Sequence, residues 1–153
     1  LLRPVRVLPD ADTVFLVSCV AGKRARRAAA RDLYTSDWFV KARHYVEATG
    51  RPWYILSAEH GLVHPDTPLE PYETTLNTMP VAQRRAWAER VDAQLAEAVP
   101  TLAYATFLAG QRYREILETL LNARGVETAV PMAGLRIGEQ LAWLAEQTHD
   151  DGR

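Results

Sequence analysis

The chain has 153 residues, of which 48% are hydrophobic and 24% charged, and its net charge is −1. This composition is typical of a globular domain with its own core and excludes a disordered chain. The near-neutral charge excludes a whole-protein basic field for nucleic acid, although residues 23–31 are locally basic. Cys19 is the single cysteine, so there is no disulfide framework, and no apolar run approaches the ~20 residues of a membrane span. We therefore expect one cytoplasmic domain over residues 1–153, with an ordered core of about 13–147.

Residues 13–18 form a continuous apolar and β-branched run, which predicts a strand buried on both faces. A turn of small residues follows, and the Ala/Arg-rich segment 24–33 is compatible with either a helix or an ordered loop. Ser36 or Asp37 is a suitable N-cap for a helix that the Gly50-Arg51-Pro52 sequence ends. A second strand is predicted at 53–57.

The stretch 57–73 contains many ionisable groups and three prolines, which predicts a stiff loop after the second strand. A long helix is expected from Met79 to about Val99, with Pro80 in its first turn. The remaining pattern predicts strands at 103–108 and 127–130 and helices at 112–123 and 136–147. This alternation predicts an α/β fold with three layers, α/β/α, around a short, mostly parallel four-stranded sheet.

Polar and small residues follow each predicted strand. Because the carboxyl ends of parallel strands lie along one edge of the sheet, we expect these residues to line one crevice. They are Ser18, Cys19 and Lys23 after the first strand, the 57–73 loop after the second, Gly110, Arg112 and Tyr113 after the third, and Gly134 and Arg136 after the fourth.

Several kinds of chemistry can be weighed from these residues. Cys19 is either a thiolate stabilised by Lys23 or a small buried hydrophobe. Lys23 follows a glycine and can hold a phosphate or lie in a solvated turn, but the G-x-x-x-x-G-K-[ST] pattern is absent. His60 and His64 lack the helical setting of a metal site, so we expect neither a metal nor a cofactor. No G-x-S-x-G sequence is present, which disfavours a serine hydrolase.

Carboxylates and tyrosines are the remaining candidates for proton transfer and ligand contact. Asp32, Glu59, Asp66 and Glu73 are suitable general acids or bases. Tyr34, Tyr72 and Tyr113 can stack on a planar ligand or donate a hydrogen bond to it. The tryptophans Trp38, Trp87 and Trp143 stand at helical spacing and are expected in the core.

The segment I-L-S-A-E-H-G-L at 55–62, followed by Pro65-Asp66 and by E-P-Y-E at 70–73, forms a strand-plus-loop signature. With Cys19, Lys23 and the segment 32–39 upstream, and with 108–113 and 134–141 downstream, it resembles a family of small bacterial domains of unknown function. The S-A-x-x-G-L…P…PY part is also similar to the DNA-binding YaaA peroxide-stress family. The Ser18-Cys19…Lys23 turn is similar to a loop of archaeosine synthase, which acts on a modified base in tRNA.

Domains of this kind resemble the uracil-DNA glycosylase fold, which holds a base in a pocket at its strand exits. The motifs G-Q-D-P-Y and H-P-S-P of those enzymes are absent, so the resemblance implies a modified base rather than uracil. A base-excising enzyme needs a carboxylate near the sugar, planar side chains around the flipped base and cations for the phosphates.

On this basis the sequence predicts a DNA glycosylase for a modified base, for example a phage-type base, with a role in anti-phage defence or DNA repair. The alternatives are a non-catalytic DNA-binding module of the YaaA type and an enzyme acting on free nucleosides or nucleotides. The predicted catalytic residues are Glu73, Asp32 and Tyr72. The predicted substrate-binding residues are Ser18, Cys19, Lys23, Tyr34, Ser36, Ser57, Glu59, His60, Gly61, Asp66, Gly110, Arg112 and Tyr113.

Overall fold

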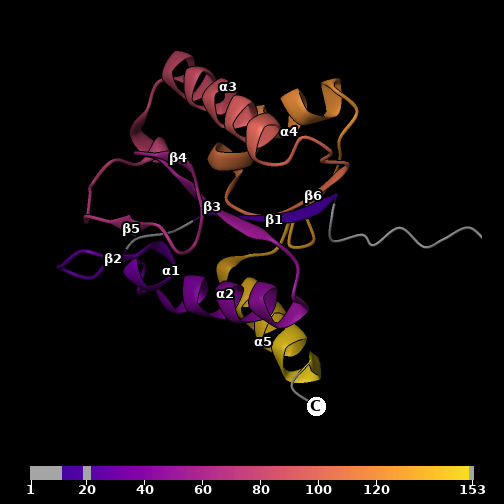
Figure 1. Cartoon of the computed structure of the whole chain (residues 1–153). Helices are drawn as coiled ribbons and strands as arrows, with labels where there is room; N and C mark the ends of the chain where they lie inside the picture. The colour runs from indigo at the N-terminus through magenta and orange to yellow at the C-terminus, as the bar shows by residue number, and fades with distance from the viewer. Residues whose placement is uncertain (1–11, 19–21, 152–153) are drawn as a thin grey trace, which may run out of the picture.

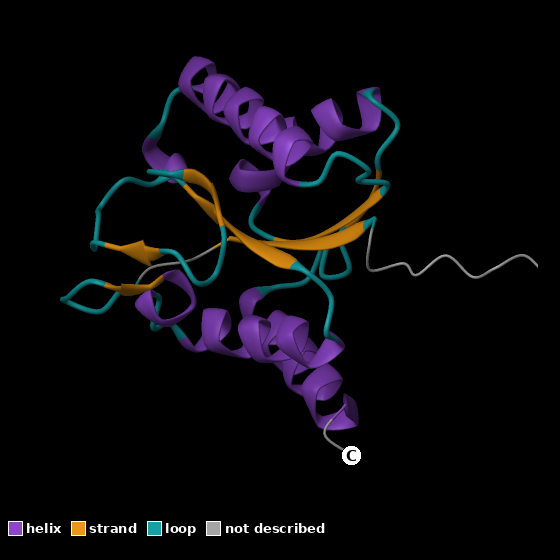
Figure 2. Cartoon of the chain, viewed as in Figure 1, coloured by secondary structure: helices purple, strands orange, loops and turns teal. Residues whose placement is uncertain are grey.

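The fold is built on a five-stranded sheet covered by helices on both faces (Figures 1 and 2). The computed structural model of the chain describes residues 12–18 and 22–151. The strand order is β4-β3-β1-β6-β7, in which β3, β1, β6 and β7 are parallel and β4 is antiparallel to β3. The strands are β1 (Thr13–Ser18), β3 (Trp53–Ser57), β4 (Gly61–Val63), β6 (Tyr104–Leu108) and β7 (Glu127–Ala129).

Strand β1 lies at the centre of the sheet, between β3 and β6, and all six of its residues are buried. Phe15 pairs with Trp53 of β3 on one side and with Thr106 of β6 on the other. Side chains alternate along a strand, so Val14 and Leu16 enter one core and Phe15 and Val17 enter the other. The predicted strand buried on both faces is confirmed.

Two helical layers enclose these two cores, with α3 and α4 on one face and α1, α2 and α5 on the other (Figure 1). The three-layer prediction is therefore confirmed at the level of the α/β class. The helices are α1 (Ala30–Leu33), α2 (Asp37–Thr49), the 3-10 turn η2 (Leu76–Thr78), α3 (Val81–Ala98), α4 (Gln111–Ala123) and α5 (Ile137–Asp151).

The predicted helix ends are largely those of the structure. The Ser36 hydroxyl accepts the Phe39 amide at 3.1 Å and caps α2, and Gly50 ends that helix in the left-handed conformation. Pro80 stands at the N-cap of α3 rather than inside its first turn, and no side chain caps this helix. Trp38 and Trp87 are buried, as expected. No helix in the described part of the chain is long and apolar enough to span a bilayer.

The sheet has five strands rather than the predicted four, because β4 forms inside the stretch predicted to be a loop. Gly61, with φ of +78°, follows a tight turn and reverses the chain, so that Leu62 pairs with Leu56. The Leu62 amide donates to Gln94 Oε1 of α3 at 2.8 Å. Three residues are too few for a period-two pattern, and His60 before the strand and His64-Pro65 after it conceal it.

The basic segment 24–33 is an ordered loop with one helical turn at its end, which settles the alternative left open by the sequence. Lys23 forms an antiparallel bridge with Tyr34, and the Arg24 amide donates to the Leu33 carbonyl. Beyond this bridge β2 (Ala28–Ala29) pairs with β5 (Pro68–Leu69). The loop is thereby fixed at both ends.

Candidate functional site

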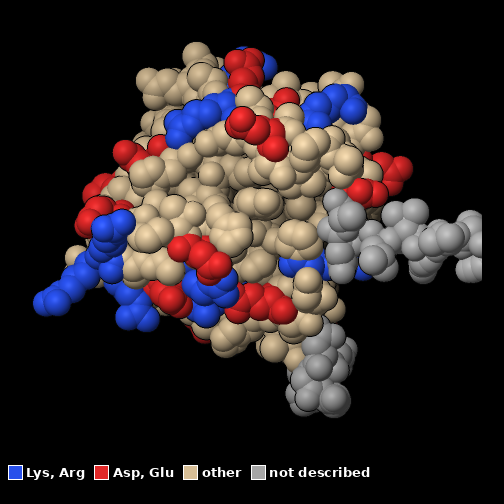
Figure 3. Space-filling model, viewed as in Figure 1, with Lys and Arg blue, Asp and Glu red and all other residues tan. Residues whose placement is uncertain are grey.

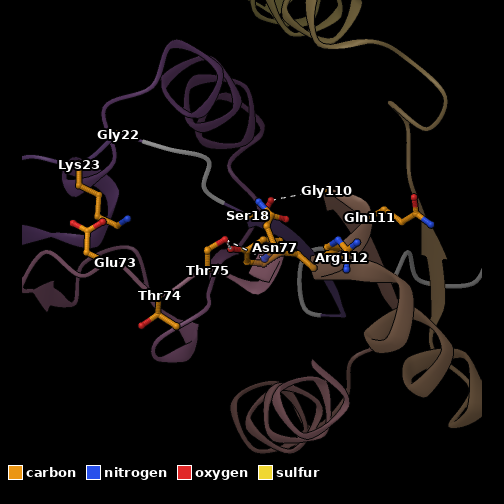
Figure 4. Close-up of a pocket in the computed structure, with 11 residues that line it drawn as sticks. Ser18, Gly22, Lys23, Glu73, Thr74, Thr75, Asn77, Gly110, Gln111 and Arg112 are labelled. Carbon is orange, nitrogen blue, oxygen red and sulfur yellow. Dashed lines mark hydrogen bonds between the residues drawn. The ribbon is translucent and has the colours of Figure 1, made fainter. Parts of the chain in front are cut away.

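A pocket of about 570 Å³ opens where β1 and β6 end (Figure 4). The chain runs from β1 to β3 and then crosses back over β1 to β6, so the following helices lie on opposite faces of the sheet. Such a switch point is where open α/β sheets bind ligands. We call this cavity the strand-exit pocket. Its lining residues are Ser18, Gly22, Lys23, Glu73, Thr74, Thr75, Asn77, Gly110, Gln111, Arg112 and Tyr113.

The middle of the pocket is formed by the backbone and small side chains at the ends of β1 and β6. The buried Ser18 hydroxyl accepts the Gly110 amide at 3.3 Å (Figure 4). Gly110 is the N-cap of α4, and no side chain caps this helix. The first amides of an uncapped helix carry partial positive charge, and Arg112 adds a full charge at the same place. This part of the pocket is suited to a phosphate.

A lysine held over two aromatic rings lies toward the other end of the pocket, to the left in Figure 4. Lys23 Nζ is 4.5 Å from the centre of the Tyr72 ring and 5.8 Å from that of Tyr34. The two tyrosine hydroxyls are 2.6 Å apart and share a hydrogen bond, and the Ser57 hydroxyl donates to Tyr72 at 2.9 Å. The His60 ring packs edge-on against Tyr72. These contacts fix the ring on which the ammonium rests.

Glu73 is the carboxylate of the strand-exit pocket, at the same end as Lys23 (Figure 4). It is exposed and follows Tyr72 directly in the chain. Glu59 does not line the pocket and instead accepts a hydrogen bond from the Thr74 hydroxyl. Of the four carboxylates that the sequence singled out, Glu73 alone lines this cavity.

Tyr113 forms part of the wall and holds the segment that closes the pocket. The tyrosine is 7% exposed, and its hydroxyl accepts the Leu76 amide at 3.3 Å. Its ring packs edge-on against Trp87, whose Nε1 donates to the Ser57 carbonyl at 2.8 Å. Residues Thr74, Thr75 and Asn77 of that segment line the pocket and were missed by sequence reasoning. Their one signal was that they directly follow the ionisable loop.

The structure brings six of the predicted site residues into this one cavity. They are Ser18, Lys23, Glu73, Gly110, Arg112 and Tyr113. Three more, Tyr34, Tyr72 and Ser57, form the hydrogen-bonded cluster beneath Lys23, and His60 adjoins it. Cys19 lies outside the described residues. The predicted convergence of strand exits therefore holds for β1, the loop after β3, and β6.

Other predicted site residues do not line the strand-exit pocket. Asp32, a predicted catalytic residue, does not line the pocket and pairs with Arg43 of α2 at 3.0 Å. Asp66 is two-thirds exposed and pairs with Arg31. Ser36 caps α2, as described above.

Gly61 also has a packing role, because a Cβ at this position would collide with the Gln94 side chain of α3. The described part of the chain contains no group of three or more His, Cys, Asp or Glu side chains that could hold a metal ion.

Fold and site together define an α/β domain with a cationic and acidic pocket at the topological switch point of its sheet. The chain belongs to a family of unknown function, DUF6884, whose model matches residues 14–146. No curated protein matches the chain.

Proposed function

We propose that this protein hydrolyses the N-glycosidic bond of a modified nucleobase in DNA, with the nucleotide bound in the strand-exit pocket. The observation that carries the proposal is one cavity that holds a carboxylate, Glu73, together with two cations, Lys23 and Arg112. A glycosylase needs a carboxylate at the sugar and cations at the flanking phosphates. The 55–73 signature resembles that of small domains similar in fold to uracil-DNA glycosylases, and this also supports the proposal.

Each group then has a role in the reaction. A phosphate binds at the uncapped start of α4 and Arg112. Glu73 accepts a proton from water as the water oxygen bonds to C1′ of the sugar, while the C1′–N bond breaks and its electron pair leaves with the base. The proton passes on to the departing base. Negative charge on Glu73 also stabilises the oxocarbenium-like sugar. Lys23 binds the second flanking phosphate.

The tyrosine cluster has a positioning role in this mechanism. Tyr34 and Tyr72 do not line the strand-exit pocket, and their rings lie beneath Lys23 instead. We therefore assign them to holding Lys23 and Glu73 rather than to stacking on the base. Asp32, which was predicted as an alternative to Glu73, has no part because its side chain pairs with Arg43.

A basic loop favours DNA over a free nucleotide as the substrate. Arg24, Arg26 and Arg27 are exposed and follow Lys23 directly in the chain. Figure 3 shows blue side chains projecting from the left edge of the molecule, where Figure 1 places this loop before β2. A polyanion held in the strand-exit pocket can continue over these arginines.

Free nucleotides are the second candidate, because a pocket of about 570 Å³ falls within the range of small-molecule sites, about 300–1,000 Å³. Binding of a free nucleotide depends weakly on salt, whereas binding of DNA weakens steeply.

The test is to incubate the protein with oligonucleotides that carry different modified bases and to measure alkali-labile abasic sites. The wild-type protein is expected to release one of these bases. Glu73→Gln should lower the rate at least about 100-fold, as expected for loss of a general base. Glu70→Gln is the matched control, because Glu70 is also exposed but does not line the pocket. Its rate should equal that of the wild type.

Two results would reject the proposal. One is a wild-type rate in Glu73→Gln when both variants melt as the wild type does. The other is DNA binding without abasic sites from any modified base, which assigns the chain to the non-catalytic DNA-binding alternative.

A further inference from the structure

A second pocket, of about 270 Å³, lies on the other side of the start of α4, between the ends of β6 and β7. We call it the flanking pocket. It shares Gly110 and Gln111 with the strand-exit pocket, so the two cavities are separated only by the first residues of α4. Figure 4 shows Gln111 on the side of Gly110 that faces away from Lys23. The far wall contains Met132 and Gly134, which follow the fourth parallel strand.

Arg114 lines the flanking pocket and is incompletely satisfied there. Its Nε is the one buried side-chain nitrogen or oxygen without a hydrogen-bond partner in the part of the chain that the structure describes. Its Nη1 has a distant ionic contact, 3.8 Å from Glu118. A buried donor without a partner is costly, and native proteins rarely retain one unless a ligand, an ion or water satisfies it.

The surroundings favour an anion over a neutral acceptor. The guanidinium carries a full positive charge, and the start of α4 adds positive potential beside it. Trp38, Phe107 and Met132 line the same pocket and are buried, so they lower the local dielectric. The Gln140 amide is already occupied, because its oxygen accepts Trp38 Nε1 and its nitrogen donates to the Leu135 carbonyl, each at 2.9 Å. Gln140 therefore supports the wall, and Arg114 is the charged residue of the described lining.

We propose that the flanking pocket is an oxyanion subsite, in which Arg114 binds a phosphate joined to the nucleotide in the strand-exit pocket. The identity of this phosphate as part of a nucleic acid strand rests on the proposed function. The binding of an oxyanion by Arg114 does not, because it rests on the cavity, on the charge of the guanidinium and on the unpaired Nε. The substrate is accordingly one that carries at least two phosphates, one on either side of the start of α4.

The first measurement is an NMR titration of the full chain with inorganic phosphate, in which the side-chain Nε–Hε resonances of the arginines are followed. The Arg114 resonance should shift in a saturable manner, and that of Arg124 should not, because Arg124 is paired with Asp92 outside both pockets. In Arg114→Gln the saturable response should be lost. An Arg114 resonance that phosphate does not move would overturn the proposal.

The second measurement separates a strand phosphate from a free anion. A 5′-phosphorylated dinucleotide should bind Arg114→Gln at least about tenfold more weakly than wild type, the loss expected for one charge-assisted hydrogen bond. The matching mononucleotide should bind both proteins equally. Arg114→Lys keeps the charge without the guanidinium fork and should recover only part of the dinucleotide affinity. Arg124→Gln controls for a change of net charge.

The outcomes distinguish this inference from the proposed function. A phosphate response at Arg114 without release of any base would keep the subsite and reject the glycosylase. Base release that is unchanged in Arg114→Gln, with equal dinucleotide affinity, would keep the glycosylase and reject the strand phosphate at this subsite.

Discussion

The hydroxyl of Tyr72 joins three segments that are far apart in the sequence. It shares a hydrogen bond with Tyr34 at 2.6 Å and accepts one from Ser57 at 2.9 Å, while its ring lies beneath Lys23. The ring and the hydroxyl therefore contribute to different properties, and substitution can separate them.

We predict that Tyr72→Phe lowers the free energy of unfolding by about 1–2 kcal/mol, because two part-buried hydroxyls lose a shared partner. Nucleotide binding should change little, since the ring beneath Lys23 remains. Tyr72→Leu should destabilise the protein and also weaken nucleotide binding. Urea unfolding and a binding titration on both variants check this. Equal binding by Tyr72→Leu and Tyr72→Phe would show that the ring does not position Lys23.

Single residues also explain which site assignments the sequence could supply. Lys23, Glu73 and Arg112 were found because each follows a strand end or a loop signature. Asp32 was chosen by the same reasoning, but its carboxylate pairs with Arg43 of α2, eleven residues further on. Residue type does not reveal which of several cations a carboxylate will contact, because that choice depends on how the helix packs.

The basic loop between Lys23 and Ala28 begins at the strand-exit pocket, which Lys23 lines, and continues through exposed residues. Its base is fixed by the Lys23–Tyr34 bridge and by the pairing of β2 with β5. In the described part of the chain, Arg26 and Arg27 have no ion-pair partner, whereas Arg31 is paired with Glu47 and Asp66. Arginines without carboxylate partners, on a fixed loop, are suited to binding phosphates.

We predict that Arg26→Ala combined with Arg27→Ala reduces the slope of log affinity against log salt for DNA by up to about 2, because each phosphate contact contributes roughly 0.7–0.9. The mononucleotide affinity should not change, since neither arginine lines the pocket. Arg85→Ala, at an exposed position of α3, is the control and should leave the slope unaltered. Binding titrations at several salt concentrations measure this. An unchanged slope in the double variant would exclude the loop from the DNA contact.

At the scale of the whole molecule, the sheet divides the interior into two separate cores. Val91 of α3 packs in the core that contains Leu16, and Val46 of α2 packs in the core that contains Phe15. All four are at most 4% exposed. The two faces are joined by the strands and not by direct packing between α2 and α3.

We predict that Val46→Ala and Val91→Ala each lower the free energy of unfolding by about 1–3 kcal/mol, through lost burial and a residual cavity. In the double variant the two losses should add to within about 0.5 kcal/mol, because residues without shared partners behave independently. Chemical denaturation of the wild type, the two single variants and the double variant measures these free energies. A coupling well above this value would show that the two cores are energetically joined.

The sequence alone determined the α/β class, the four parallel strands and most ends of the helices. Those features follow from local patterns of burial, capping and turn residues, which are properties of neighbouring positions. It also placed six of the pocket residues, because parallel strands bring their carboxyl ends to one edge. Strand β4, the tyrosine cluster beneath Lys23, the pairing of Asp32 with Arg43 and the flanking pocket around Arg114 were decided only by the tertiary structure. They depend on contacts between residues distant in the chain, and no local period or motif encodes such contacts.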